Sequence, residues 1–221
     1  MTSMRTRSLS DYPFQAPRIH VLSPGFLRRT PNGAILEARS SVTLVCTGQI
    51  NIVIDTGLPG DGDSILEGLE GIGLKPSDVD VVVNTHDHLD HTGENRLFTK
   101  ARIICGYRDL VKDGVRIQVV PARITPLPKH RAELAPNVYV IRTPGHTRDS
   151  ISVVIRGAES DFADSTGTVV AAGDALPTEA NSLQGVPPAI SYSRSVSIRS
   201  MAMITKMADW VIPGHDRPFR V

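Results

Sequence analysis

The sequence has little cysteine, which limits the covalent bonds that could hold the fold together. Its 221 residues include only two cysteines, Cys46 and Cys105, and both lie within apolar stretches. Cysteines in such surroundings are typical of thiols in a reducing compartment. We therefore expect a cytoplasmic protein, although the sequence by itself leaves a disulfide between Cys46 and Cys105 open.

Long hydrophobic runs are also missing. No apolar stretch approaches the roughly 20 residues that a membrane-spanning helix needs. No apolar segment follows the N-terminus as it does in a secretory signal. The sequence therefore predicts no membrane partner. We interpret residues 1–17 as a poorly ordered N-terminal lead-in and residues 18–221 as a single domain.

Net charge is small as well. The chain carries 24 Lys and Arg against 23 Asp and Glu, a formal net charge of +1. This balance does not require a nucleic-acid or anionic-membrane partner, and we expect no tight binding to duplex DNA. A local basic patch is still compatible with it. The sequence leaves the choice between a monomer and a homodimer open.

The sequence does contain a regular alternation of short apolar segments with segments of helical periodicity. Strands are predicted at 19–22, 42–47, 50–54, 80–84, 101–105, 117–120, 138–142, 151–155, 168–172 and 210–212. Helices are predicted at 64–71, with Asp63 as N-cap, at 92–97 and at 195–207. A hairpin is expected around the turn at 31–33. The alternation predicts an α/β fold in which helices cover both faces of paired sheets.

Residues 86–91 read His-Asp-His-Leu-Asp-His, just past a predicted strand. Imidazole and carboxylate groups are the ligands of zinc, iron and manganese. His86 and His88 are two positions apart, so both point to the same side of an extended chain. Asp90 and His91 follow at a turn that would bring them to the other side of the same pocket. This stretch alone can therefore supply ligands to two adjacent metal sites.

Three further predicted strands end in a ligand-type residue, and in each case a glycine comes immediately before it. These residues are His146, Asp174 and His215. Glycine lets the backbone approach a site closely. A single Pro-Gly-His sequence is usually only a turn. Three such strand ends together with the 86–91 stretch are far more specific, and they indicate one shared metal centre.

These motifs resemble the metallo-β-lactamase fold superfamily of metallohydrolases, over nearly the whole chain. The resemblance implies an α/β fold of four layers, the αβ/βα sandwich. It also implies two divalent metal ions, with zinc as the first expectation and iron or manganese as alternatives. Seven residues match the ligand positions of the dinuclear members of the superfamily: His86, His88, Asp90, His91, His146, Asp174 and His215.

The resemblance also implies a role for each of these residues. The first metal ion would be held by three histidines: His86, His88 and His146. The second would be held by Asp90, His91 and His215. Asp174 would bridge the two ions, and Asp55 would support the ligands from behind. The expected nucleophile is a metal-bridging hydroxide, and Asp90 and His88 are the predicted catalytic residues.

The substrate is left open between RNA and a small thioester or ester. Segments at 143–154, 167–174 and 210–221 resemble the branch of metallo-β-lactamase domain-containing protein one, which is associated with endoribonuclease activity on histone pre-mRNA. Glyoxalase II is also similar around the metal ligands, which makes hydrolysis of a small thioester, ester or lactone the alternative. A mononuclear iron dioxygenase matches less well, because such enzymes leave the second set of ligand positions unused.

Substrate selection would come from loops over the metal ligands. Three stretches are candidates: 26–32, 121–136 and 177–194. The second contains Arg123, Lys129 and Arg131, which would hold the phosphates of an RNA substrate. The alternative interpretation of these residues is an ordinary solvated basic loop.

Overall fold

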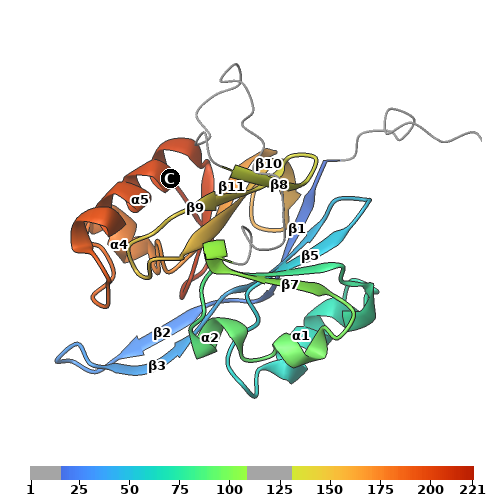
Figure 1. Cartoon of the computed structure of the whole chain (residues 1–221), viewed down its shortest axis with the longest axis horizontal. Coiled ribbons are helices and arrows are strands. Elements are labelled where there is room, and N and C mark those ends of the chain that lie inside the picture. Colours follow the sequence, from blue (N-terminus) through green and yellow to red (C-terminus); the bar gives the residue numbers. More distant parts are fainter. Residues whose placement is uncertain (1–15, 109–130) are drawn as a thin grey trace, which may run out of the picture.

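The computed structural model describes residues 16–108 and 131–221, which build a continuous sheet of 11 strands folded into two halves (Figure 1). The first half follows the order β1 (Arg18–Ser23), β4 (Val42–Cys46), β5 (Asn51–Ile54), β6 (Val81–Asn84) and β7 (Arg102–Cys105). The second half contains β8 (Arg131–Ala135), β9 (Val138–Arg142), β10 (Ile151–Ser160), β11 (Gly167–Gly173), β12 (Trp210–Pro213) and β13 (Phe219–Arg220). The halves join where β1 and β10 pair in parallel.

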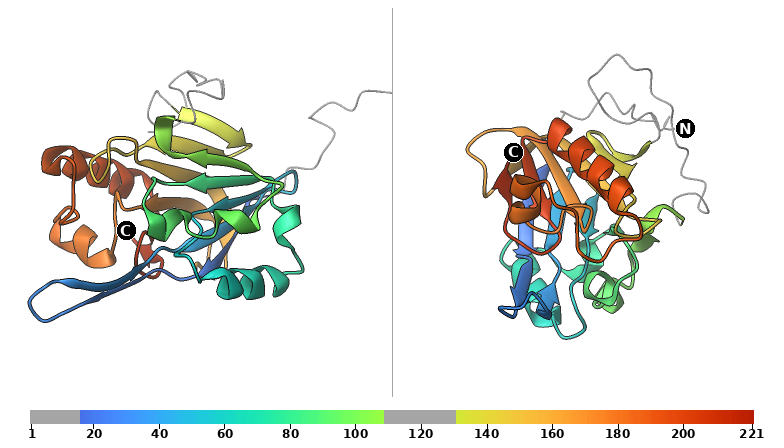
Figure 2. Two further views of the ribbon diagram at one scale, coloured as in Figure 1. Left: turned by 60° about the horizontal axis from the view of Figure 1, so that its bottom comes forward. Right: turned by 90° about the vertical axis from the view of Figure 1, so that its left-hand side faces the viewer.

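Helices lie outside the sheet. The described helices include α1 (Gly62–Glu70), α2 (Leu89–Thr92), α4 (Glu179–Gln184) and α5 (Arg194–Met207), with 3₁₀ turns at Pro76–Asp78 and Asn95–Leu97. Helix α1 packs on the first half and α5 on the second (Figure 2). The four-layer αβ/βα sandwich is therefore confirmed. Within the described ranges, no helix has both the length and the hydropathy to cross a membrane.

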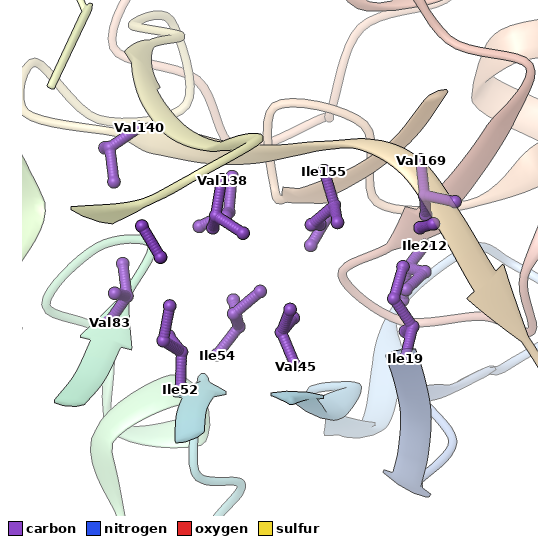
Figure 3. Packing of buried hydrophobic residues seen from close by; sticks show 14 of the residues in the cluster. Ile19, Val45, Ile52, Ile54, Val83, Val138, Val140, Ile155, Val169 and Ile212 are labelled. Carbon is purple, nitrogen blue, oxygen red and sulfur yellow. The ribbon is translucent and has the colours of Figure 1, made fainter. Parts of the chain in front are cut away.

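Alternating side chains along the strands build three apolar layers. In β6, Val83 points between the two halves, whereas Val82 points toward α1. In β10, Ile155 points between the halves and Val154 points toward α5. Successive side chains of a strand face opposite ways, so a strand buried on both faces contributes to two layers. Figure 3 shows the central layer, in which side chains of the two halves point toward one another.

A hairpin outside the main sheet matches the predicted turn at 31–33. Strand β2 (Phe26–Arg29) pairs antiparallel with β3 (Ile35–Arg39). The hairpin projects from the body of the molecule in Figures 1 and 2. The stretch at 26–32, a candidate for substrate selection, therefore consists of strand β2 and the start of the hairpin turn.

Two helix predictions were wrong in their boundaries. Helix α1 begins at Gly62 and its N-cap is Asp61 rather than Asp63. The carboxylate of Asp61 accepts a hydrogen bond from the Leu58 N–H, so the chain has already turned before Asp63 is reached. The predicted helix at 92–97 is instead α2 followed by a separate 3₁₀ turn.

The expected loops also differ from the structure. The stretch at 177–194 contains α4, whose N-cap Thr178 accepts a hydrogen bond from the Asn181 N–H. The predicted strand at 117–120 lies outside the described residues. So does most of the stretch at 121–136, and its described part consists largely of strand β8.

Two leucines on α1 provide a test of the packing. Leu69 is fully buried, whereas Leu66 is 38% exposed on the same helix. We expect Leu69→Ala to lower the free energy of unfolding by about 2–5 kcal/mol, because it removes apolar contacts and leaves a cavity. Leu66→Ala should cost less than about 1 kcal/mol. Urea unfolding of the metal-free protein measures both, and equal losses would contradict the burial of Leu69.

Candidate metal centre

All seven predicted ligands lie at one end of the two sheet halves. They come from the ends of four strands and from α2: His86 and His88 after β6, Asp90 and His91 in α2, His146 after β9, Asp174 after β11, and His215 after β12. The structure therefore brings together residues that are up to 129 positions apart, and their role as ligands stays a prediction. Two groups of three have their ligand atoms within 4.8 Å of one another: His86, His88, His146 and Asp90, His91, His215. A third group at the same spacing combines one residue of each with Asp174: His86, His91, Asp174.

Asp174 lies between these two groups. Its Oδ1 is 3.1 Å from Nε2 of His215 and 3.4 Å from Nε2 of His91, both in the second group. Its Oδ2 is 3.4 Å from Nε2 of His146, in the first group. One carboxylate thus reaches both groups with different oxygens, as a bridging ligand would.

The donor atoms of the centre fit divalent metal ions. Nε2 of His86, Nε2 of His91 and Oδ1 of Asp174 are buried and have no hydrogen-bond partner. A buried polar atom without a partner costs about 1–3 kcal/mol. Imidazole nitrogens and carboxylate oxygens turned toward one small volume would be satisfied together by divalent cations.

Three of the histidines are oriented by hydrogen bonds from Nδ1. Nδ1 of His91 donates to Oδ2 of Asp55 at 2.8 Å. Nδ1 of His146 donates to the carbonyl of Ile190 at 2.7 Å, and Nδ1 of His215 donates to the carbonyl of Arg39 at 2.9 Å. Such bonds fix the tautomer and leave Nε2 with its lone pair toward the centre.

Asp55 is held in place by Thr85. The Thr85 N–H donates to Oδ1 of Asp55 at 2.7 Å, and the Thr85 hydroxyl donates to Oδ2 at 2.9 Å. Asp55 itself has a φ of +57°, a conformation that Asp adopts more readily than most residues. The predicted supporting position of Asp55 thus agrees with its contacts. The sequence did not predict that the carbonyls of Ile190 and Arg39 orient His146 and His215, because every residue has a backbone carbonyl.

Two of the glycines that precede ligands allow close contacts. A Cβ on Gly214 would collide with Oδ1 of Asp174, and a Cβ on Gly145 would collide with Ser197 on α5. Gly145 also has a φ of +142°. The sequence argument that these glycines permit close backbone approach is correct at both positions.

Burial and charge set the protonation of the centre without metal. Burial, together with His91, holds the pKa of His86 well below its usual range. Burial opposes charge on His91, but Asp55 and Asp174 outweigh it and raise the pKa of His91 well above its usual range. Burial alone would raise the pKa of Asp174, yet His215 and His91 hold it well below normal. Asp174 is therefore ionised and His86 neutral, the forms that bind metal.

Comparison with known protein families identifies the superfamily of the chain. The sequence model of the metallo-beta-lactamase superfamily matches residues 37–215, a range that includes all seven positions. The chain belongs to the metallo-beta-lactamase superfamily.

Members of this superfamily resemble the chain over most of its length. It is 35% identical over 212 residues to metallo-beta-lactamase domain-containing protein 1 of Xenopus laevis, covering 96% of this chain and 85% of that protein. It is 32% identical over 203 residues to a probable metallo-hydrolase of Methanocaldococcus jannaschii, covering 90% and 86%. The structure of a probable metal-dependent hydrolase from Staphylococcus aureus superposes with a TM-score of 0.65 at 19% identity, over 93% and 91% of the chains.

As a member of the metallo-beta-lactamase superfamily, the chain is a metallohydrolase, and its fold implies divalent metal ions. The candidate ligands are the His and Asp side chains of the centre. His88 is the exposed member of its group, and the other two are buried. His88 is therefore the candidate ligand of this group that is exposed to solvent.

The bond between Asp55 and His91 is open to test. We expect Asp55→Asn to weaken metal binding by about 10–100-fold, because an amide orients the imidazole less well and removes a negative charge. Asp87→Asn is the matched control, since Asp87 lies within the same motif and is exposed. Competition with a chromogenic chelator measures both affinities. Equal affinities in the two variants would contradict the supporting role of Asp55.

The pKa shifts predict how metal binding depends on pH. Asp174 also raises the pKa of His215, against the effect of burial, so His91 and His215 retain protons at higher pH than ordinary histidines. A metal ion must displace those protons, so its affinity should fall as pH drops through the raised pKa values. Zinc titrations between about pH 6 and pH 8 should show this fall and a release of protons into weak buffer. An affinity independent of pH would contradict the assigned protonation.

Proposed function

We propose that the chain is a dinuclear metal-dependent hydrolase that cleaves a small ester, thioester or lactone. The position of Asp174 between two groups of three ligands supports the dinuclear centre. Zinc is the first candidate for both ions, and iron or manganese are alternatives, because His and Asp ligands suit all three. A mononuclear iron dioxygenase would leave the second group without metal and its buried atoms unpaired.

The observation that carries the substrate proposal is the pocket beside the centre. It has a volume of about 210 Å³ and reaches five of the seven predicted ligands. Its remaining walls are mostly apolar, formed by Leu27, Ile35, Ala38, Pro177, Pro188, Ala189 and Ile190. Pockets for drug-sized ligands measure about 300–1,000 Å³. Both size and lining therefore suit a short acyl group better than a nucleotide chain.

The side chains in this pocket indicate which nucleophile is used. Among the described residues that line it, none has a hydroxyl, thiol or amine, so water is the nucleophile that they support. Two divalent metal ions bound there would supply hydroxide at neutral pH and polarise the scissile carbonyl.

Two predicted catalytic residues face the pocket from the centre. Oδ2 of Asp90 is 3.6 Å from Nε2 of His215, and both Asp90 and His88 line the pocket. The half-buried carboxylate of Asp90 can accept a hydrogen bond from the attacking group and hold its proton for the leaving group. His88 fixes the position at which the carbonyl meets the centre. The apolar walls exclude other water.

Cleavage of RNA is the second candidate, and one contact outside the pocket favours it. The guanidinium of Arg148 lies 4.4 Å from the ring centroid of Tyr192, whose N–H donates to the carbonyl of His146. An exposed arginine and tyrosine beside a hydrolytic centre could hold a phosphate and stack on a base. Of the basic residues predicted to hold RNA, Arg123 and Lys129 lie outside the described residues. Arg131 stacks on Tyr139 in the neighbouring strand.

The remaining partner and location proposals rest on composition. The near-neutral charge supports neither a membrane nor a duplex DNA partner. The low cysteine content supports a cytoplasmic location.

A panel of substrates tests the proposed function. The reconstituted protein should contain two metal ions per chain and hydrolyse p-nitrophenyl hexanoate and a hexanoyl thioester faster than it cleaves single-stranded RNA. His88→Ala should abolish turnover with the fold retained, because the residue lies on a loop. Asp174→Asn should weaken one metal ion more than the other, since a neutral amide is a poorer bridge than a carboxylate.

Each part of the proposal has its own contrary result. One metal ion per chain by elemental analysis would exclude the dinuclear centre. Faster cleavage of RNA than of any ester, lost in Arg148→Ala and Tyr192→Ala, would favour the second candidate. Full activity of His88→Ala at full metal loading would remove His88 from the mechanism.

A further inference from the structure

The β2–β3 hairpin presents one of its faces to the pocket. Two cross-strand pairs form this face: Leu27 opposite Ala38, and Arg29 opposite Ile35. All four residues line the pocket together with the centre. Residues directly opposite each other on paired strands project to the same side. Both pairs of residues therefore contribute to one wall of the pocket.

A β-bulge places Ile35 on this face. Ile35 and Ala38 are three positions apart and would point to opposite sides of a regular strand. The pairing shifts between Arg28 and Arg29, which leaves Leu36 as an extra residue in β3. Such bulges re-aim side chains and are common beside active sites. Here the bulge brings Ile35 and Ala38 to the same side.

Arg29 is the unusual residue of this face. Among the described residues that line the pocket, it is the only arginine or lysine. Its Nη1 donates to the carbonyl of Gly33 at 3.0 Å, and no described carboxylate lies within ion-pair distance of it. By contrast, the neighbouring Arg28 pairs with Glu37 at 3.3 Å. Within residues 16–108 and 131–221, no carboxylate therefore neutralises the charge on Arg29.

The position of Arg29 relative to the metal centre follows from the register. The carbonyl of Arg39 contacts His215, so this end of β3 lies at the centre. Phe26 pairs with Arg39, and Arg29 follows Phe26 by three residues, roughly 10 Å along the strand. The apolar side chain of Leu27 lies between them on the pocket face. A substrate that extends from the metal centre would contact the apolar wall first and the guanidinium of Arg29 last.

From this arrangement we infer that the substrate carries a second, anionic group, a carboxylate or a phosphate, which Arg29 binds at the outer end of the pocket. The inference rests on the proposed function, in which the scissile acyl group lies at the metal centre. The substrate is then an acyl compound whose apolar spacer ends in an anion. Arg29 binds this anion through guanidinium N–H groups other than the one that donates to the carbonyl of Gly33.

Matched substrates and variants test this specificity. Mono-p-nitrophenyl esters of adipic and suberic acid are compared with p-nitrophenyl hexanoate and octanoate, which have the same lengths and no second charge. For at least one length, the parent should show a KM about 10-fold lower for the acidic ester, from one charge-assisted hydrogen bond. Arg29→Gln should remove this preference, so that its KM values for the acidic and neutral esters of one length become equal. Arg29→Lys should keep part of it.

Arg28→Gln is the control, because it removes the same charge from the adjacent position, where Glu37 is the partner. It should keep the preference of the parent. A p-nitrophenyl ester with a terminal phosphate distinguishes phosphate from carboxylate recognition. Equal KM values for acidic and neutral esters in the parent, or equal losses in Arg28→Gln and Arg29→Gln, would overturn the inference.

A binding measurement separates this inference from the proposed function. Calorimetry on the metal-loaded protein gives dissociation constants for adipate and suberate against hexanoate and octanoate, the products of these esters. The acids with two carboxylates should bind more tightly in the parent and not in Arg29→Gln. If no ester is hydrolysed, the proposed function fails. In that case, the ratio of these dissociation constants still supports or overturns the role of Arg29, because binding is measured independently of hydrolysis.

Discussion

A buried carboxylate, Asp174, is the group on which the two halves of the molecule converge. Its oxygens lie within 3.4 Å of His91 from the first half and of His146 and His215 from the second. An isolated charge buried in this way is too costly to keep, so it needs cations or protonated partners around it. The strand ends must therefore meet at this point. The joined sheet and the central apolar layer hold them there.

The walls of the pocket and the groups that orient the candidate metal ligands belong to the same segments. Ile190 lines the pocket, and its carbonyl accepts the hydrogen bond that orients His146. Strand β3 contributes Ile35 and Ala38 to the pocket, and the carbonyl of Arg39 orients His215. Substrate shape and metal geometry are thus physically linked. A wall substitution that shifts the backbone would also rotate an imidazole, whereas one that changes only the side chain would alter specificity alone.

The surroundings of the centre differ inside and outside the pocket. Inside it, the hairpin and the segment before α5 form mostly apolar walls that also include Arg29. Outside it, Arg148 stacks on the exposed ring of Tyr192, whose N–H donates to the carbonyl of His146. A short acyl compound would use the first and a nucleotide chain the second. The same metal chemistry can serve either, because polarising a carbonyl or a phosphoryl oxygen makes similar demands on the ligands.

The sequence by itself determined most strands of the core, the α/β alternation and the set of seven ligand-type residues. Side-chain periodicity and ligand chemistry are local properties that depend on residue type. Only the tertiary structure decided how those ligands are oriented and what lines the pocket. Arg39 supports His215 across 176 positions through a carbonyl that every residue has. The bulge at Leu36 turns Ile35 toward the pocket through a shift in strand pairing, and no residue type in this stretch predicts that shift. Contacts made by backbone atoms between distant segments arise only when the layers pack, so they could not be inferred from residue types alone.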